Sequence, residues 1–155
     1  MSFIVPAPTP ATEEAEIVSG PFWPHIDPAT VREAHNIDHT VSPIRLRVTL
    51  IEAIAATNGE LRAWRLARQA EGTATLAEVE AEQIDETSIL VQRYHRAVGS
   101  HAKALLLERT RDFDSTAKGD KEADALAPQI DDHWRDYRRA IGDITGAGRT
   151  TVELI

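Results

Sequence analysis

The histidines of this chain could carry out the most varied chemistry, because histidine can bind a metal, transfer a proton or fill a core. His35 and His39 are four residues apart, a spacing that places two imidazoles on one helix face. A zinc site of this kind needs a third ligand, and none is obvious nearby. Asp38 and Thr40 indicate that a helix has already ended, so we expect surface or capping histidines. His101 falls on an apolar stripe and is expected to be a hydrogen-bonded core histidine.

Three further patterns resemble ligand or catalytic motifs but have the wrong spacing. The Asp-x-Asp run from Asp112 begins like a calcium loop, but Ala117 stands where that loop requires glycine. The Gly-Ala-Gly run at 146–148 lacks the strand and helix of a dinucleotide-binding turn. Asp131 and Asp132 are adjacent and face apart on a helix, which argues against an acid–base pair. We therefore expect no catalytic residue, no cofactor, no metal and no enzyme activity.

Charge and cysteine content limit the function further. The 155 residues include 25 acidic and 17 basic side chains, giving a net charge of -8. An acidic chain gains little from counterion release, so it is a poor candidate for binding nucleic acid over its whole surface. No cysteine is present, which excludes disulfides and thiol chemistry and fits a reducing cytoplasm. We expect no signal peptide and no membrane span.

The prolines separate an arm from the rest of the chain. Six of the eight prolines lie in the first 28 residues. Because proline fixes φ and removes a backbone donor, residues 1–26 are expected to form an extended arm outside the core. Phe22 and Trp23 are the exception, since two large aromatic side chains are costly to expose. They are expected to dock either on the parent domain or on a neighbour.

Helical periodicity dominates residues 27–146, which we expect to form one elongated all-α bundle of one short and three long helices. Asp27-Pro28 and Ser42-Pro43 each combine an N-cap with proline at the first helical position. The second of these is expected to start one long helix to about residue 70, weakened near Gly59. Its apolar residues form a wide stripe made of two rows, Ile44, Val48, Ile51 and Ala55, and Leu50, Ile54, Leu61 and Trp64.

An acidic connector and two more helices follow. Residues 73–85 are polar and contain no basic residue. A helix is predicted from about residue 86 to about residue 113. The last helix either begins at Pro128 or runs from about residue 120 with a kink at that proline. The tail, residues 147–155, ends in an alternating β-branched run that is typical of a strand and has no partner in its own chain.

Residues 114–121 and the helix after them allow two interpretations. The loop sets two lysines and two aspartates around a glycine, and Trp134, Arg135, Tyr137 and Arg138 follow. A solvated turn, with aromatic residues inward and arginines outward on the helix, is one interpretation. A subunit contact is the other, because Trp, Tyr and Arg dominate interface hot spots.

Three segments together resemble the head completion protein family of Peduovirus-type contractile-tailed phages. They are FWPHIDP from Phe22, DSTAKGDKEAD from Asp114 and IDDHWRDYR from Ile130. The resemblance extends from about residue 20 to the C-terminus, and Pro128 departs from the family's pattern. It implies a structural virion protein of the head–tail neck, assembled in the host bacterial cytoplasm. Members resemble α-helical adaptors that form a ring, expected to be twelve-fold, below the portal protein.

The resemblance also implies partners, and for these we hypothesise contact sites from the residues themselves. The ring would extend the DNA channel, DNA would pass without specific binding, and a neck or tail terminator protein would attach to the ring. The tail would add as a strand to the portal or a neighbour through Thr150, Thr151, Val152, Glu153, Leu154 and Ile155, and a frayed terminus is the alternative. Subunit contacts are expected at Phe22, Trp23, Lys118, Asp120, Lys121, Trp134, Arg135 and Arg138. The acidic residues hypothesised to face the channel and repel phosphate are Glu78, Glu80, Glu82 and Asp85, and an ordinary solvated loop is the alternative.

A small helical DNA-binding or packaging factor of the terminase type is the alternative. The arginines that favour it give the second predicted helix a basic side: Arg45, Arg47, Arg62, Arg65 and Arg68. The acidic total charge argues against it.

Overall fold

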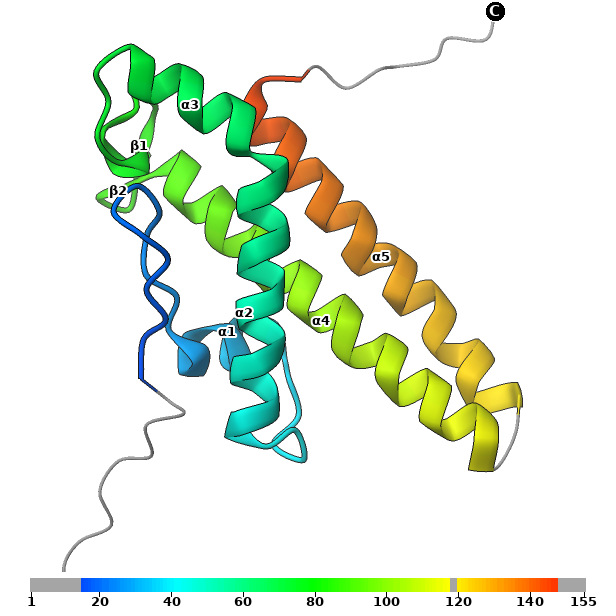
Figure 1. Cartoon of the computed structure of the whole chain (residues 1–155). Coiled ribbons are helices and arrows are strands. Elements are labelled where there is room, and N and C mark those ends of the chain that lie inside the picture. Colours follow the sequence, from blue (N-terminus) through cyan, green and yellow to red (C-terminus); the bar gives the residue numbers. More distant parts are fainter. Residues whose placement is uncertain (1–14, 118–119, 148–155) are drawn as a thin grey trace, which may run out of the picture.

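The computed structural model describes residues 15–117 and 120–147, and these form a predominantly helical chain (Figure 1). The helices are α1 (Pro28–Ala34), α2 (Pro43–Glu60), α3 (Arg62–Ala70), α4 (Ile89–Ala117) and α5 (Asp120–Thr145). Between α3 and α4 lie a 3₁₀ turn, η2 (Leu76–Glu78), and a small antiparallel hairpin of β1 (Gln83–Ile84) and β2 (Thr87–Ser88). The all-α prediction is confirmed.

Both predicted helix starts are confirmed by their capping bonds. The Asp27 carboxylate accepts hydrogen bonds from the backbone N–H groups two and three residues further on, at 3.2 and 3.1 Å. Ser42 Oγ accepts one from the N–H of Arg45 at 3.3 Å. The proline after each cap occupies the first helical position, where its missing N–H costs no hydrogen bond.

The single helix predicted up to residue 70 is wrong, because the chain turns at Leu61. This residue has φ -86° and ψ 2°, and its side chain is fully buried. Gly59, a weak helix former, lies two residues before the turn. The buried leucine anchors the corner while α3 leaves the direction of α2 (Figure 1). Gly72, with φ 95°, then ends α3 as the sequence predicts.

The last part of the predicted arm belongs to the core, which corrects the expectation that residues 1–26 lie outside it. Ile17 and Ile26 exchange backbone hydrogen bonds of 2.7 and 3.0 Å and so close a loop. Within that loop Phe22 and Trp23 are buried. The prolines prevent a helix here, but they do not prevent burial, and two aromatic side chains contribute a large apolar area.

The two long helices form an antiparallel hairpin that α2 crosses near its open end (Figure 1). The final helix runs from Asp120 through Pro128, so the second of the two predicted alternatives for its start holds. The crossing region comprises residues 15–61, 89–106 and 130–145 and contains nearly all of the buried side chains. The distal hairpin comprises residues 107–117 and 120–129, and Ala123 is the one buried residue among its described side chains.

Candidate interaction surfaces

Phe22 and Trp23 pack inside the chain itself. The Trp23 ring stacks on Tyr94 of α4 with centroids 4.8 Å apart, and Phe22 meets Trp23 edge-on at the same distance. The Phe22 carbonyl accepts a hydrogen bond from the N–H of Leu76 at 2.8 Å, which ties the loop to η2. Phe22 and Trp23 therefore dock on their own domain, which is the first of the two predicted alternatives.

Trp134 also makes its main contacts within the chain. Its Nε1–H donates to Glu108 Oε1 of α4 at 2.8 Å. The His101 ring packs between Trp134 and Tyr137, with centroid distances of 4.8 and 4.7 Å. The Tyr137 hydroxyl donates to Glu60 Oε2 of α2 at 2.6 Å. This cluster therefore joins α5 to both α4 and α2.

Burial sets the protonation of the cluster and of its neighbour Tyr94. It raises the pKa of Tyr94 to about 12. Burial, together with the acceptor Glu60, also raises the pKa of Tyr137, so both hydroxyls remain donors near neutral pH. Burial lowers the pKa of His101, whose buried Nδ1 has no hydrogen-bond partner. The core position predicted for His101 is confirmed, but the hydrogen bond expected for it is absent at that nitrogen.

The basic residues of the expected subunit interface do not form one cluster. Arg135 and Arg138 are exposed on α5, and Arg135 pairs with Asp132 one turn earlier at 2.6 Å. Lys121 is exposed at the start of the same helix, thirteen residues before Trp134 and therefore about 20 Å away. Lys118 and the Asp120 side chain lie outside the described part, as do the tail residues 150–155.

The acidic connector is more ordered than the sequence indicates. Glu78 closes a capping box, with its Oε2 accepting from the N–H groups of Ala74 and Thr75, both at 3.1 Å. Asp85 and Glu86 have φ of 54° and 58°, the pattern of a type I′ turn between β1 and β2. No glycine marks this turn, so the sequence did not reveal the hairpin.

The remaining acidic residues of the connector are exposed: Glu80, Glu82 and Asp85.

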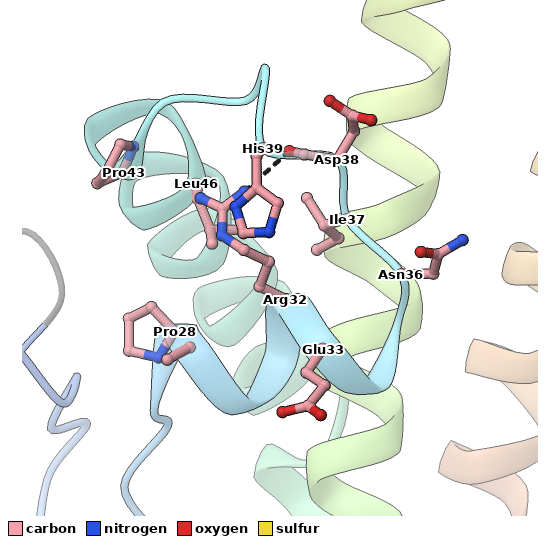
Figure 2. A pocket seen from close by; sticks show the side chains of 10 residues that line it. Pro28, Arg32, Glu33, Asn36, Ile37, Asp38, His39, Pro43 and Leu46 are labelled. Carbon is pink, nitrogen blue, oxygen red and sulfur yellow. Dashed lines mark hydrogen bonds between the residues drawn. The ribbon is translucent and has the colours of Figure 1, made fainter.

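His35 and His39 lie in different environments. Figure 2 shows His39 in a pocket lined by α1 and the loop after it, where Arg32 donates to the carbonyl oxygens of Asp38 and Val41 at 2.8 and 3.0 Å. Arg32 thus fixes the loop that leads into α2. A guanidinium beside His39 also makes this pocket unfavourable for a cation.

His35 packs on α4 instead. Its ring lies so close to Gly99 that a side chain at that position would collide with it. Burial and the nearby charge of His133 lower the pKa of His35. Among the described residues, no three histidine, aspartate or glutamate side chains are grouped to hold a metal.

The arginines behind the DNA-binding alternative are partly engaged within the chain. Arg47 donates to the Ala15 carbonyl at 2.6 Å, and Arg68 pairs with Glu71 at 3.0 Å. The two helices that carry these arginines meet directly at Leu61, without the turn of about three to four residues that a helix-turn-helix requires.

The sequence pattern did not distinguish one exposed apolar surface of α2 from the core. The row of Leu50, Ile54 and Leu61 is buried as expected. The neighbouring row of Ile44, Val48 and Ile51 is exposed to solvent on the opposite side of α2. Both rows have the helical period, so the sequence carries no signal that separates the exposed row from the buried one.

Comparison with known proteins assigns the chain to a protein family. A family model described as phage head completion protein (GPL) matches residues 17–155. The chain is 45% identical over 148 residues to the head completion/stabilization protein of Escherichia phage P2, covering 96% of this chain and 88% of that protein. It belongs to the phage head completion protein family. Membership gives the chain a structural role in phage head assembly, and the family is not an enzyme class.

No solved structure gives a significant match. Within the described residues, no helix is both long and apolar enough to cross a membrane.

Proposed function

We propose that this head completion protein is a ring adaptor of the head–tail neck, which binds the portal after DNA packaging. Family membership over residues 17–155 carries the proposal. Twelve copies form the ring, extend the DNA channel and offer their far side to a neck or tail terminator protein.

Exposed charges support the assignment of contacts within the ring. A head-to-tail ring joins two different surfaces of neighbouring copies. Arg135 and Arg138 on α5, and separately Lys121 at the start of that helix, supply basic side chains for one side of this contact. Glu80, Glu82 and Asp85 are exposed on the connector and face the channel, where carboxylates repel the phosphates of passing DNA.

The tail makes the contact with the portal in this proposal. Its alternating β-branched sequence is suited to adding a strand to an exposed sheet edge, in which backbone hydrogen bonds supply much of the affinity. DNA is not a ligand of the ring, in agreement with the net charge of -8.

Mixing purified portal rings with this protein tests the proposal. We expect the full chain to add a ring of density below the portal in negative-stain images, and a chain lacking residues 149–155 to lose this attachment. Circular dichroism of the shortened chain should show unchanged helix content. A chain lacking residues 2–14 is the matched control for loss of a terminal segment and should still attach. Equal attachment of all three chains would refute the role of the tail, and no ring with any of them would refute the adaptor.

A further inference from the structure

The side of α2 that faces away from the core carries an uncovered apolar row. Ile44, Val48 and Ile51 are 60%, 58% and 50% exposed. Ala55, also exposed, continues the row. The successive spacings of four, three and four residues are those of the a and d positions of a coiled coil. The row therefore has the spacing of a helix-packing interface, and no other described part of the chain covers it.

The edges of this row are defined. On one flank the segment 15–19 runs beside α2, because Arg47 donates to Ala15 at 2.6 Å and Asn58 donates to Ser19 at 3.3 Å. Val18 on this segment is 62% exposed and widens the apolar surface. Single exposed apolar side chains are ordinary, but a contiguous group of this kind marks an interaction site.

The other flank carries one charge of each sign. Arg45 and Glu52 are seven residues apart, so they lie on the same side of the row. Both are exposed, and neither forms an ion pair in the chain as described. When two copies of α2 pack antiparallel about a two-fold axis, Arg45 of each copy lies beside Glu52 of the other, which gives two equivalent ion pairs. A parallel pair would instead use Arg47, which Ala15 already engages.

We propose that this face of α2 binds a second copy of the same chain in an antiparallel, two-fold pair. Ile44 then packs opposite Ala55 of the other copy, and Val48 opposite Ile51. The seam is about 16 Å long. Such a seam is short compared with stable dimer interfaces, so the pair is weak and reversible. It is a state of the free protein and is independent of the ring proposed above, whose symmetry is cyclic.

Disulfide trapping tests the geometry, because the chain has no cysteine of its own. We expect an Ile44→Cys chain mixed with an Ala55→Cys chain of different mass to form the mixed disulfide dimer under mild oxidation. Neither variant alone should cross-link efficiently, because each position is about 16 Å from its own copy in the antiparallel pair. Like-with-like dimers, or none at all, would overturn the proposal.

Analytical ultracentrifugation of charge variants tests the pairing chemistry. Arg45→Glu and Glu52→Arg should each weaken dimerisation by about fivefold, and the double variant should restore it. Val48→Asp should weaken it by about tenfold or more, because it buries an unpaired charge. Leu66→Asp is the matched control, since Leu66 is exposed on α3 away from the row and should leave dimerisation unchanged. Restoration by the double variant is the result that a merely destabilised fold does not produce.

Two other occupants of the row are outcomes of the same measurements, and each overturns the proposal. A full chain that is monomeric but dimerises after removal of residues 2–14 would assign the row to the chain's own N-terminal segment. A chain that is monomeric in both forms, and that loses portal attachment on Val48→Asp alone, would assign the row to the portal. The oligomeric state is measured without the portal, and the second result requires a parent chain that attaches to it, so failure of the pair and failure of the ring are separable.

Discussion

The crossing region and the distal hairpin share the same two long helices but are held together differently. In the crossing region, α4 and α5 are covered by α2 and by the loop of Phe22 and Trp23. Hydrogen bonds from two tyrosine hydroxyls join α4 and α5 to α2. Tyr94 donates to Asn58 of α2 at 2.6 Å, and Tyr137 donates to Glu60 at the same distance. In the distal hairpin, α4 and α5 pack mainly on each other, Arg109 donates to Thr49 Oγ1 of α2 at 3.0 Å, and most described side chains are exposed.

The long helices of this chain are therefore not equally stable along their length. The apolar burial that stabilises the fold is concentrated at one end. The other end is held by helix propensity, by the packing of α4 on α5 and by the hydrogen bond of Arg109 to Thr49, so it opens at a lower free energy than the crossing region. Three substitutions test how stability is distributed between these two regions.

Trp23→Ala should have the largest effect. It removes a nearly buried indole that stacks on Tyr94, and it should lower the free energy of unfolding by about 3–5 kcal/mol. Urea denaturation followed by far-UV circular dichroism measures the loss. Leu126→Ala, at a half-buried position in the distal hairpin, is the comparison and should cost clearly less. Equal losses at the two positions would show that stability is spread evenly along the helices.

Pro128→Ala should strengthen the distal hairpin. Proline lacks the N–H that would donate to the carbonyl of Asp124 one turn earlier in α5. Restoring that bond should raise the stability of this part of α5 by about 1–3 kcal/mol. Hydrogen exchange should show slower exchange in residues 120–129 and little change near Tyr94. Gln129→Ala is the neighbouring control, and a gain as large as that of Pro128→Ala would contradict this role of the proline.

His101→Leu should have the smallest effect, visible as a change in pH dependence. Burial lowers the pKa of His101 in the folded chain. As pH falls below about 6.5, the unfolded chain therefore takes up a proton that the folded chain does not, and stability decreases. The leucine variant should lose less stability than the parent between about pH 7 and pH 5. His39→Leu, at an exposed histidine, is the control and should leave the pH dependence of stability unchanged. The prediction is contradicted if the parent and His101→Leu lose the same free energy of unfolding over this pH range.

Much of the fold follows from local sequence signals. Asp27 and Ser42, each before a proline, mark helix starts because a side-chain oxygen and a missing N–H act within a single turn. The corner at Leu61 could not be placed, because it depends on a leucine anchored by distant residues while the helical apolar period continues past it. The aromatic residues of the loop were expected to be covered, but their partner Tyr94 is about 70 residues further on in the sequence.

The candidate surfaces were less predictable. A helix pattern reports which residues share a face, but it does not state how many faces are covered. The row of Ile44, Val48 and Ile51 has the same period as the buried row of Leu50 and Ile54, and only the tertiary arrangement separates them. The turn at Asp85 and Glu86 was missed because non-glycine residues with positive φ leave a weak signal.

The length of α4 has a mechanical consequence. Its 29 residues span about 43 Å, and α4 is bonded to α2 as far along as Arg109, which donates to Thr49 Oγ1 at 3.0 Å. Beyond that bond, residues 110–117 extend α4 by about 12 Å. A rotation of about 5° at Arg109 moves the end of α4 by about 1 Å, on the same helix geometry. A small change in the angle between α4 and α2 therefore displaces the far end of the hairpin.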